Sequence, residues 1–142
     1  MTGDDLLALP VRSRGIRLGF PVDLIVDLDG LRVVGLEVQC GDDVRRVLPL
    51  AAAAVGVDEI AVPSALMLFD ELGAAFYRER ASALSRLRGS DVELNGRPVG
   101  ALRDVVVSAD GSIEAFVVEH DGRLSEVEPG PRLRVGAVAT AA

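Results

Sequence analysis

The segment GRPVGALRDVVV, residues 96–107, decides the fold because nearly the same segment, GIRLGFPVDLIV, occupies residues 15–26. Each copy has two glycines separated by three residues, one aspartate inside an apolar run, and a downstream Asp-Gly pair followed by a second apolar run. This recurrence indicates an internal duplication, in which each copy is one supersecondary unit. Five residues recur 81 positions later, namely Gly15, Gly19, Asp23, Asp29 and Gly30 at Gly96, Gly100, Asp104, Asp110 and Gly111.

The apolar runs of each copy are short, and residues that favour tight turns separate them. In the first copy, residues 18–26 and 33–40 flank Asp29-Gly30, and the second copy repeats the arrangement. An aspartate can bond its own backbone and a glycine tolerates a positive φ, so each pair predicts a β-hairpin. Short strands joined by tight turns are typical of small β-barrels.

We therefore expect a mainly β protein with two small β-barrels that arise from the duplication and are joined by an amphipathic α-helix. The first barrel is predicted over residues 1–63 and starts with a strand at residues 6–11, and the second barrel is predicted over residues 89–142. Units of about 60 residues are marginally stable alone, so we expect the halves to pack against each other.

The connector, residues 64–88, differs in pattern from both copies. Its apolar residues Leu66, Phe69, Leu72 and Phe76 recur at threes and fours, and no proline interrupts them. This spacing predicts one amphipathic helix, which Gly73 could break.

The charge of the chain argues against a general nucleic-acid binder. The net charge is −7, whereas a protein that neutralises phosphates needs a basic surface. All basic residues are arginine, which indicates a GC-rich bacterial coding sequence. The start has no basic, apolar leader and no segment reaches about 20 apolar residues, so we expect a cytoplasmic protein without membrane insertion.

No residue constellation predicts catalysis, a metal site or a cofactor. Cys40 is the only cysteine and His120 the only histidine, and each precedes a predicted turn without a partner group. Residues 27–30 resemble the start of a calcium loop but lack its later ligands, which favours a turn. We expect no catalytic residues, no metal ligands and no cofactor.

The repeated glycines and aspartates are instead predicted to form turns and close packing. Asp23 and Asp104 are each the charged residue of an apolar strand, and we expect them at the barrel rim, bonded to backbone or to Arg17, Arg97 or Arg103, with ligand recognition as the alternative. The predicted structural set is Gly15, Gly19, Asp23, Gly30, Gly96, Gly100, Asp104 and Gly111.

One group of arginines lies in and after the connector. A solvated helix face is the interpretation that Glu79 and the acidic flanking halves favour, and contact with RNA or an acidic partner is the alternative. The group comprises Arg78, Arg80, Arg86 and Arg88, together with Tyr77.

The pattern of residues 96–119, and the same pattern in residues 15–38, resembles the PRC-barrel family. Proteins of this family include the cytoplasmic part of the photosynthetic reaction-centre H subunit, one half of a ribosome maturation factor, and archaeal division adaptors. The resemblance implies a small barrel with a binding surface and no active site. The chain shows neither the H subunit's membrane helix nor the maturation factor's separate N-terminal domain, so neither role is carried over.

These observations favour a non-enzymatic cytoplasmic binding or adaptor protein that acts through protein–protein interaction. The partner is an unidentified protein, and a homodimer is one candidate because small barrels gain stability by burying exposed surface. The alternative is an RNA- or ribosome-associated maturation or assembly factor, suggested by the resemblance and the arginine-bearing connector. A third hypothesis is an enzyme or small-ligand sensor with a cleft between the barrels.

Overall fold

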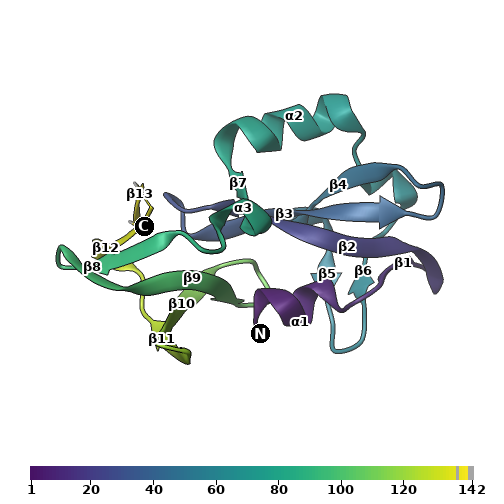
Figure 1. The fold of residues 1–142 in the computed structure, drawn as a ribbon. Coiled ribbons are helices and arrows are strands. Elements are labelled where there is room, and N and C mark those ends of the chain that lie inside the picture. The colour runs from purple at the N-terminus through teal and green to yellow at the C-terminus, as the bar shows by residue number, and fades with distance from the viewer. Residues whose placement is uncertain (137, 141–142) are drawn as a thin grey trace.

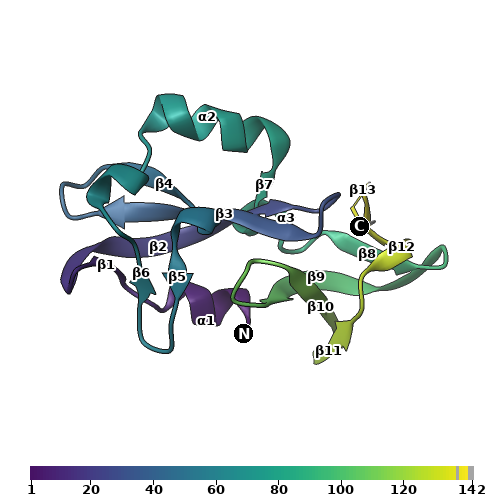
Figure 2. The same cartoon turned by 180° about the vertical axis from the view of Figure 1, so that it is seen from behind.

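A computed structural model describes residues 1–136 and 138–140, without the side chains of residues 71, 72, 78, 80 and 139. The protein is mainly β, as predicted, and its strands form two sheets that lie side by side along the molecule (Figure 1). Figure 2 shows the same arrangement from behind, with the hairpin of the second sheet reaching under the first.

The first sheet contains the strands up to residue 83. Its long central hairpin is formed by Ile16–Asp27 and Arg32–Cys40, in agreement with the hairpin predicted around Asp29-Gly30. The strands pair in the order β4-β3-β2-β1-β6-β5, and β7 pairs with β2. Their bounds are β1 (Val11–Ser13), β2 (Ile16–Asp27), β3 (Arg32–Cys40), β4 (Arg45–Pro49), β5 (Ala54–Val55), β6 (Ile60–Ala61) and β7 (Ser82–Ala83).

The second sheet contains the remaining strands, in the order β11-β10-β9-β8-β12-β13. Its central hairpin is the counterpart of the one in the first sheet. The bounds are β8 (Asp91–Leu94), β9 (Arg97–Val107), β10 (Ile113–His120), β11 (Arg123–Val127), β12 (Gly130–Val135) and β13 (Val138–Thr140).

Neither sheet closes into a barrel within the described residues, so the prediction of two closed barrels is wrong. The outer strands of the first sheet are β4 and β5, and those of the second are β11 and β13, and neither pair meets. The physical reason lies in the core. Each open sheet buries its inner face against the other half, and one continuous apolar cluster contains Leu24 and Leu36 of the first half with Leu102 and Phe116 of the second.

The connector is also not one helix. It divides into η2 (Ala65–Met67), α2 (Glu71–Arg80), β7 and α3 (Leu84–Leu87). The backbone of Phe69 exchanges hydrogen bonds of 2.9 and 2.8 Å with Val47 of β4, and β7 pairs with β2. These sheet contacts take the backbone groups that a continuous helix would need. The longest part of the predicted helix that the structure contains is α2, which lies above β3 and β4 in Figure 1.

The chain begins with a helix, α1 (Gly3–Leu7), where the sequence predicted a strand at residues 6–11. The side chain of Thr2 accepts a hydrogen bond from the Asp5 N–H, and the Asp5 carboxylate accepts one from the Thr2 N–H, which forms a capping box. A short 3₁₀ helix, η1 (Leu50–Ala52), follows β4.

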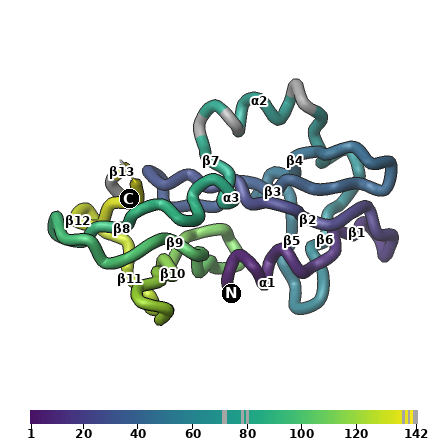
Figure 3. Tube along the Cα trace, in the orientation of Figure 1, coloured from purple at the N-terminus to yellow at the C-terminus, as the bar shows by residue number. Residues whose placement is uncertain are grey.

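The two halves exchange the segments that precede them. Thr2, ahead of the first copy, pairs with Val106 of β9, and Ala83, ahead of the second copy, pairs with Ile25 of β2. Thr2 and Ala83 are 81 positions apart in the sequence, and so are their partners Ile25 and Val106. The chain trace shows the N-terminus beside β9 (Figure 3), where the Val107 N–H donates to the Met1 carbonyl over 2.7 Å.

The hairpin turns of the two halves also meet. The Val33 N–H donates to the Gly111 carbonyl over 2.8 Å, and the Ile113 N–H donates to the Leu31 carbonyl over 2.9 Å. These paired bonds join the two sheets at their turns, so the halves pack against each other, as their small size predicts.

Candidate functional site

Asp104 is the buried carboxylate of β9, and it binds the start of α1. One oxygen, Oδ1, accepts hydrogen bonds from the Gly3 N–H at 3.0 Å and the Val105 N–H at 2.7 Å, and Oδ2 accepts from the Asp4 N–H at 3.1 Å. The residue is 7% exposed. Three backbone N–H groups satisfy the carboxylate. In accepting two of these bonds from Gly3 and Asp4, Asp104 caps the start of a helix that belongs to the other half of the fold.

Asp23 makes the corresponding contact in the first half. Its Oδ1 accepts from the Leu24 N–H at 2.9 Å and the Ser85 N–H at 3.1 Å, and Oδ2 accepts from the Ser85 hydroxyl at 2.5 Å. Ser85 lies in the first turn of α3, so each aspartate holds the short helix that precedes the opposite copy. We call these two arrangements the aspartate clips.

Within the described residues, none of the three arginines expected beside these aspartates bonds to them. Arg103 binds Glu119, and Arg17 lies over the ring of Phe20 at 4.9 Å from its centroid. Among the described residues the arginine nearest an aspartate clip is Arg88, at 4.0 Å from Asp104 Oδ1, and its closer partner is Asp4 at 2.7 Å.

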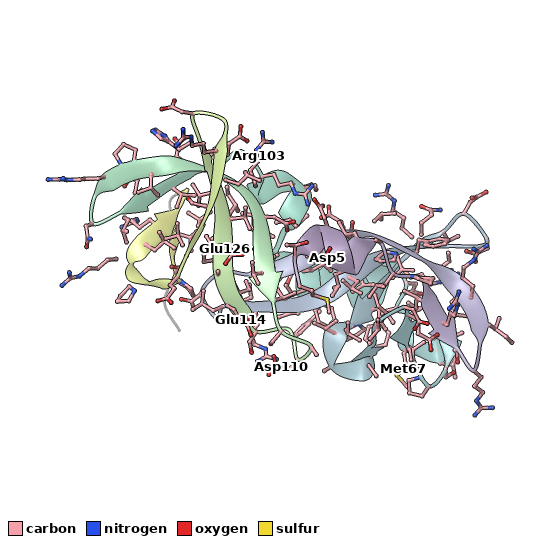
Figure 4. All side chains as sticks on the ribbon, turned by 90° about the horizontal axis from the view of Figure 1, so that it is seen from below. Asp5, Met67, Arg103, Asp110, Glu114 and Glu126 are labelled. Atoms are coloured by element: carbon pink, nitrogen blue, oxygen red, sulfur yellow. The ribbon has the colours of Figure 1, made fainter. Side chains whose placement is uncertain are left out.

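A cleft of about 540 Å³ lies beside the Asp104 clip. The charged side chains in it are paired with one another, since Arg88 binds Asp4 and Arg103 binds Glu119. Figure 4 shows Arg103 beside the hairpin that joins β10 and β11. The hydrogen bond from Arg103 lowers the pKa of the Glu119 carboxyl, and the same bond raises the pKa of the guanidinium, so both groups stay charged at neutral pH.

A second cleft, of about 380 Å³, lies beside the Asp23 clip, but its lining is different. Where the first cleft has Asp4 and Val117, the second has Ser85 and Glu37. The aspartates recur in both halves while the surrounding side chains do not. This difference favours a structural role for the aspartates over recognition of one ligand by both clefts.

A third hollow region lies beside the β1–β2 and β3–β4 turns of the first sheet, and we call it the hairpin groove. It consists of two adjoining depressions of about 470 and 320 Å³, which share Leu18 of β2 and Ala65 of η2. Two exposed apolar side chains stand on it, Ile16 with 67% and Leu66 with 83% of its surface exposed. The rest of the lining is Ser13, Arg14, Cys40, Gly41, Asp42, Arg46, Pro63, Ser64 and Leu68.

The remaining candidate residues have local partners. His120 is exposed at the β10–β11 turn beside Asp121, at 3.3 Å, and Cys40 is buried at the end of β3. The side chain of Asp27 accepts a hydrogen bond from the Gly30 N–H at 3.0 Å, which is a turn contact. Across the part of the chain that the structure describes, no three His, Cys, Asp or Glu residues are grouped to hold a metal ion.

The predicted turn and packing glycines occupy two kinds of place. Gly19 and Gly100 lie in β2 and β9, where an added Cβ would overlap the carbonyl oxygens of Gln39 and Glu119 on the neighbouring strands. The other four lie in turns or at their ends, namely Gly15, Gly30, Gly96 and Gly111.

The predicted arginine group does not form one described face. Tyr77 is on α2 and packs edge-on against Phe76 at 5.4 Å, whereas Arg86 belongs to α3 and Arg88 follows it. The side chains of Arg78 and Arg80 lie outside the described residues.

The sequence matches no protein-family model and no curated protein. The resemblance to the PRC-barrel family therefore stays a prediction. None of the helices in the described part of the chain is long and apolar enough to cross a membrane.

Proposed function

We propose that this chain is a non-enzymatic binding or adaptor protein that holds a segment of another protein in the hairpin groove. The observation that carries the proposal is the exposure of Ile16 and Leu66 on a concave apolar surface. Single exposed apolar residues are common on proteins, but two of them flanking a groove are typical of an interaction site.

The charge around the groove indicates the kind of segment that fits. Arg46 is held by two hydrogen bonds to Asp42, of 2.9 and 2.8 Å, so its charge is already matched. Arg14 also lines the groove, and no carboxylate of the described residues pairs with it. An apolar segment that carries an acidic residue would complement this arginine and bury the apolar side chains.

The internal repeat supports the same proposal through the family it resembles. We interpret the two halves as copies of a PRC-barrel-like unit whose sheets have stayed open and share one core. Members of that family act through binding surfaces, which agrees with a groove that carries no paired catalytic groups.

The test is a selection of displayed random peptides on the intact protein. We expect the selected peptides to combine apolar and acidic residues and to bind at least tenfold more weakly to Leu66→Asp, measured by fluorescence anisotropy. Val57→Asp is the matched control, because Val57 is 98% exposed in the β5–β6 loop outside the groove lining.

Two results would contradict the proposal. One is a set of selected peptides that binds Leu66→Asp as well as the parent chain. The other is binding of a labelled single-stranded RNA, with an affinity that falls steeply as salt rises, in place of peptide binding. That result would favour the RNA-associated alternative.

A further inference from the structure

Helix α2 covers the outer face of the first sheet, the face that points away from the shared core. Ala74 of this helix forms a small apolar cluster with Ile25 of β2 and Val47 of β4, and all three residues are at most 2% exposed. Val47 also exchanges backbone hydrogen bonds with Phe69, just ahead of the helix. The first sheet therefore has the core on one face and a helix on the other (Figure 1).

The second sheet has a corresponding face, which the strand registers identify. Val106 of β9 lies 81 positions after Ile25 of β2. The row of opposed residues that runs through each aspartate clip reaches Val47 in the first sheet and Glu126 in the second, and opposed residues share a face. Val106 and Glu126 therefore mark the place that matches the position of α2.

This face of the second sheet is open to solvent. Among the described residues, no helix lies over the outer face of β10 and β11, as Figures 1 and 2 show. Glu126 is exposed, Val106 and Val117 are half-buried, and Leu124 keeps 65% of its surface exposed. The second copy of the motif thus lacks the cover that α2 provides for the first.

The cleft beside the Asp104 clip lies on the same face, and its floor is apolar where the other cleft is charged. Val117 and Leu124 line it, and the registers place them where the first sheet has Glu37 and Arg45. Charged side chains can remain in water, but apolar side chains that gather in an open hollow are typical of a binding surface. The second sheet therefore has room and apolar surface for a large side chain of a partner.

The charge of the second half indicates the character of the partner. Residues 89–142 contain nine Asp and Glu residues and five Arg residues, which is a net charge of −4. Glu126 takes the position of the apolar Val47, and Glu114 is exposed on the neighbouring strand β10 (Figure 4). Neither glutamate has an ionic partner among the described residues. A basic segment complements this surface.

We propose that the outer face of β9, β10 and β11 binds a basic amphipathic helix of a partner protein, in the place that α2 takes on the first sheet. A helix is the expected occupant because α2 shows that this face of the repeated motif accepts one. The apolar stripe of the partner helix covers Val106 and Val117, and a large side chain enters the cleft beside Leu124. A Lys or Arg of the helix pairs with Glu126. This site is separate from the hairpin groove, which belongs to the first sheet.

A displayed library of single helices, with Leu and Ala fixed along one stripe and the other positions random, tests the proposal on the intact protein. We expect the selected helices to be enriched in Lys and Arg. The most frequent sequence is then made as a labelled peptide of about 15 residues, a length that can form a helix. It should bind at least tenfold more weakly to Leu124→Asp and to Glu126→Arg, measured by fluorescence anisotropy.

An exchange of charges sharpens this test. Each Lys or Arg of the peptide is changed to Glu in turn, and one of these peptides should bind Glu126→Arg more tightly than it binds the parent chain. Val57→Asp and Asp58→Arg are matched controls that should bind like the parent chain, because both residues are exposed in the β5–β6 loop of the first sheet. Circular dichroism checks that every variant is folded.

Three results would overturn the proposal. The first is a selected peptide that binds Leu124→Asp and Glu126→Arg as tightly as the parent chain, and the second is a selection without enrichment of basic residues. The third is self-association of the parent chain in sedimentation equilibrium that Leu124→Asp abolishes, since a second copy would then be the occupant. Leu66→Asp should leave helix binding unchanged, so failure at this face and failure at the hairpin groove are distinguishable.

Discussion

The two aspartate clips occupy corresponding positions but hold their helices differently. Asp104 binds the start of α1 through backbone N–H groups alone, with Arg88 at 4.0 Å, whereas Asp23 binds α3 through one backbone N–H and the hydroxyl of Ser85. A hydroxyl can rotate towards another acceptor or water, but a helix N–H cannot. The comparison therefore indicates that the stability of the fold depends more heavily on Asp104 than on Asp23.

The two sheets also differ at their edges. The first sheet covers β4 with its own chain and keeps a groove at its hairpin, whereas the second sheet leaves β11 exposed. The two copies of the motif thus share one apolar core but differ in their exposed surfaces. Surface differences of this kind are where separate functions of duplicated units are expected.

The largest effect should come from removal of a clip. Asp104→Ala leaves the Gly3, Asp4 and Val105 N–H groups without their acceptor in a buried place, and we expect a loss of about 3 to 5 kcal/mol in the free energy of unfolding. Urea denaturation followed by circular dichroism measures it.

Asp23→Ala is the comparison within the same chain, and its expected cost is smaller, at about 2 to 3 kcal/mol, because the Ser85 hydroxyl can bond to water instead. Equal costs for the two variants, or a larger cost for Asp23→Ala, would contradict the difference between the clips.

The paired glycines should show effects comparable with that of Asp23→Ala. Gly100 has φ 139°, and an added Cβ would overlap both the Glu119 carbonyl and the Val118 side chain. Gly100→Ala should cost about 3 kcal/mol, since strain and overlap add. Gly19 faces the equivalent carbonyl of Gln39 but is outside the positive-φ region, so Gly19→Ala should cost about 1 kcal/mol less.

Thermal unfolding of both glycine variants, beside Gly41→Ala as a control, measures this difference. Gly41 has open space around the position of a Cβ, so its substitution should have little effect. A Gly19→Ala variant less stable than Gly100→Ala would mean that the backbone angle adds nothing to the overlap.

Local sequence signals predicted the hairpins well because hairpins are local structures. The Asp-Gly pairs and the apolar runs beside them specify β2 with β3 and β9 with β10, and the structure contains both hairpins. The recurrence of Asp23 and Asp104 inside apolar strands also identified two residues that are buried in the fold.

Non-local partners explain what the sequence did not predict. The helix expected over residues 64–88 is interrupted because Phe69 bonds to Val47 and β7 pairs with β2, and no periodicity reports such contacts. The partners of the two aspartates lie in the opposite half of the chain. One usable signal was overlooked, since Thr2 and Asp5 have the spacing of a capping box and indicate α1.

The hairpin groove was equally hard to predict. Ile16 and Leu66 come from separate segments, and each looks like an ordinary apolar residue of its own element. Only the folded structure, in which η2 lies beside the start of β2, shows that Ile16 and Leu66 flank one surface. Exposure on a shared surface is a property of the folded chain.

The smallest effect should appear as a pH dependence at the turn that joins the halves. Hydrogen bonds from Ser108 and the Ser112 backbone lower the pKa of Asp110 from 3.8 to about 2. Because the pKa is lower in the folded state, the stabilisation is present above pH 4 and is lost as the pH falls towards 2. Asp110→Asn should therefore lower the urea midpoint at pH 7, and its midpoint should decline less between pH 4 and 2 than that of the parent chain.

The midpoints of the two proteins should converge at the acid end, because a protonated Asp110 accepts these bonds no better than an amide. A midpoint difference that stays constant from pH 7 to pH 2 would assign the effect to the shape of the turn and not to the charge of Asp110. In that case the junction between the sheets would depend on the backbone bonds of Val33 and Ile113 and on the bond from the Arg32 side chain to the Asp110 carbonyl.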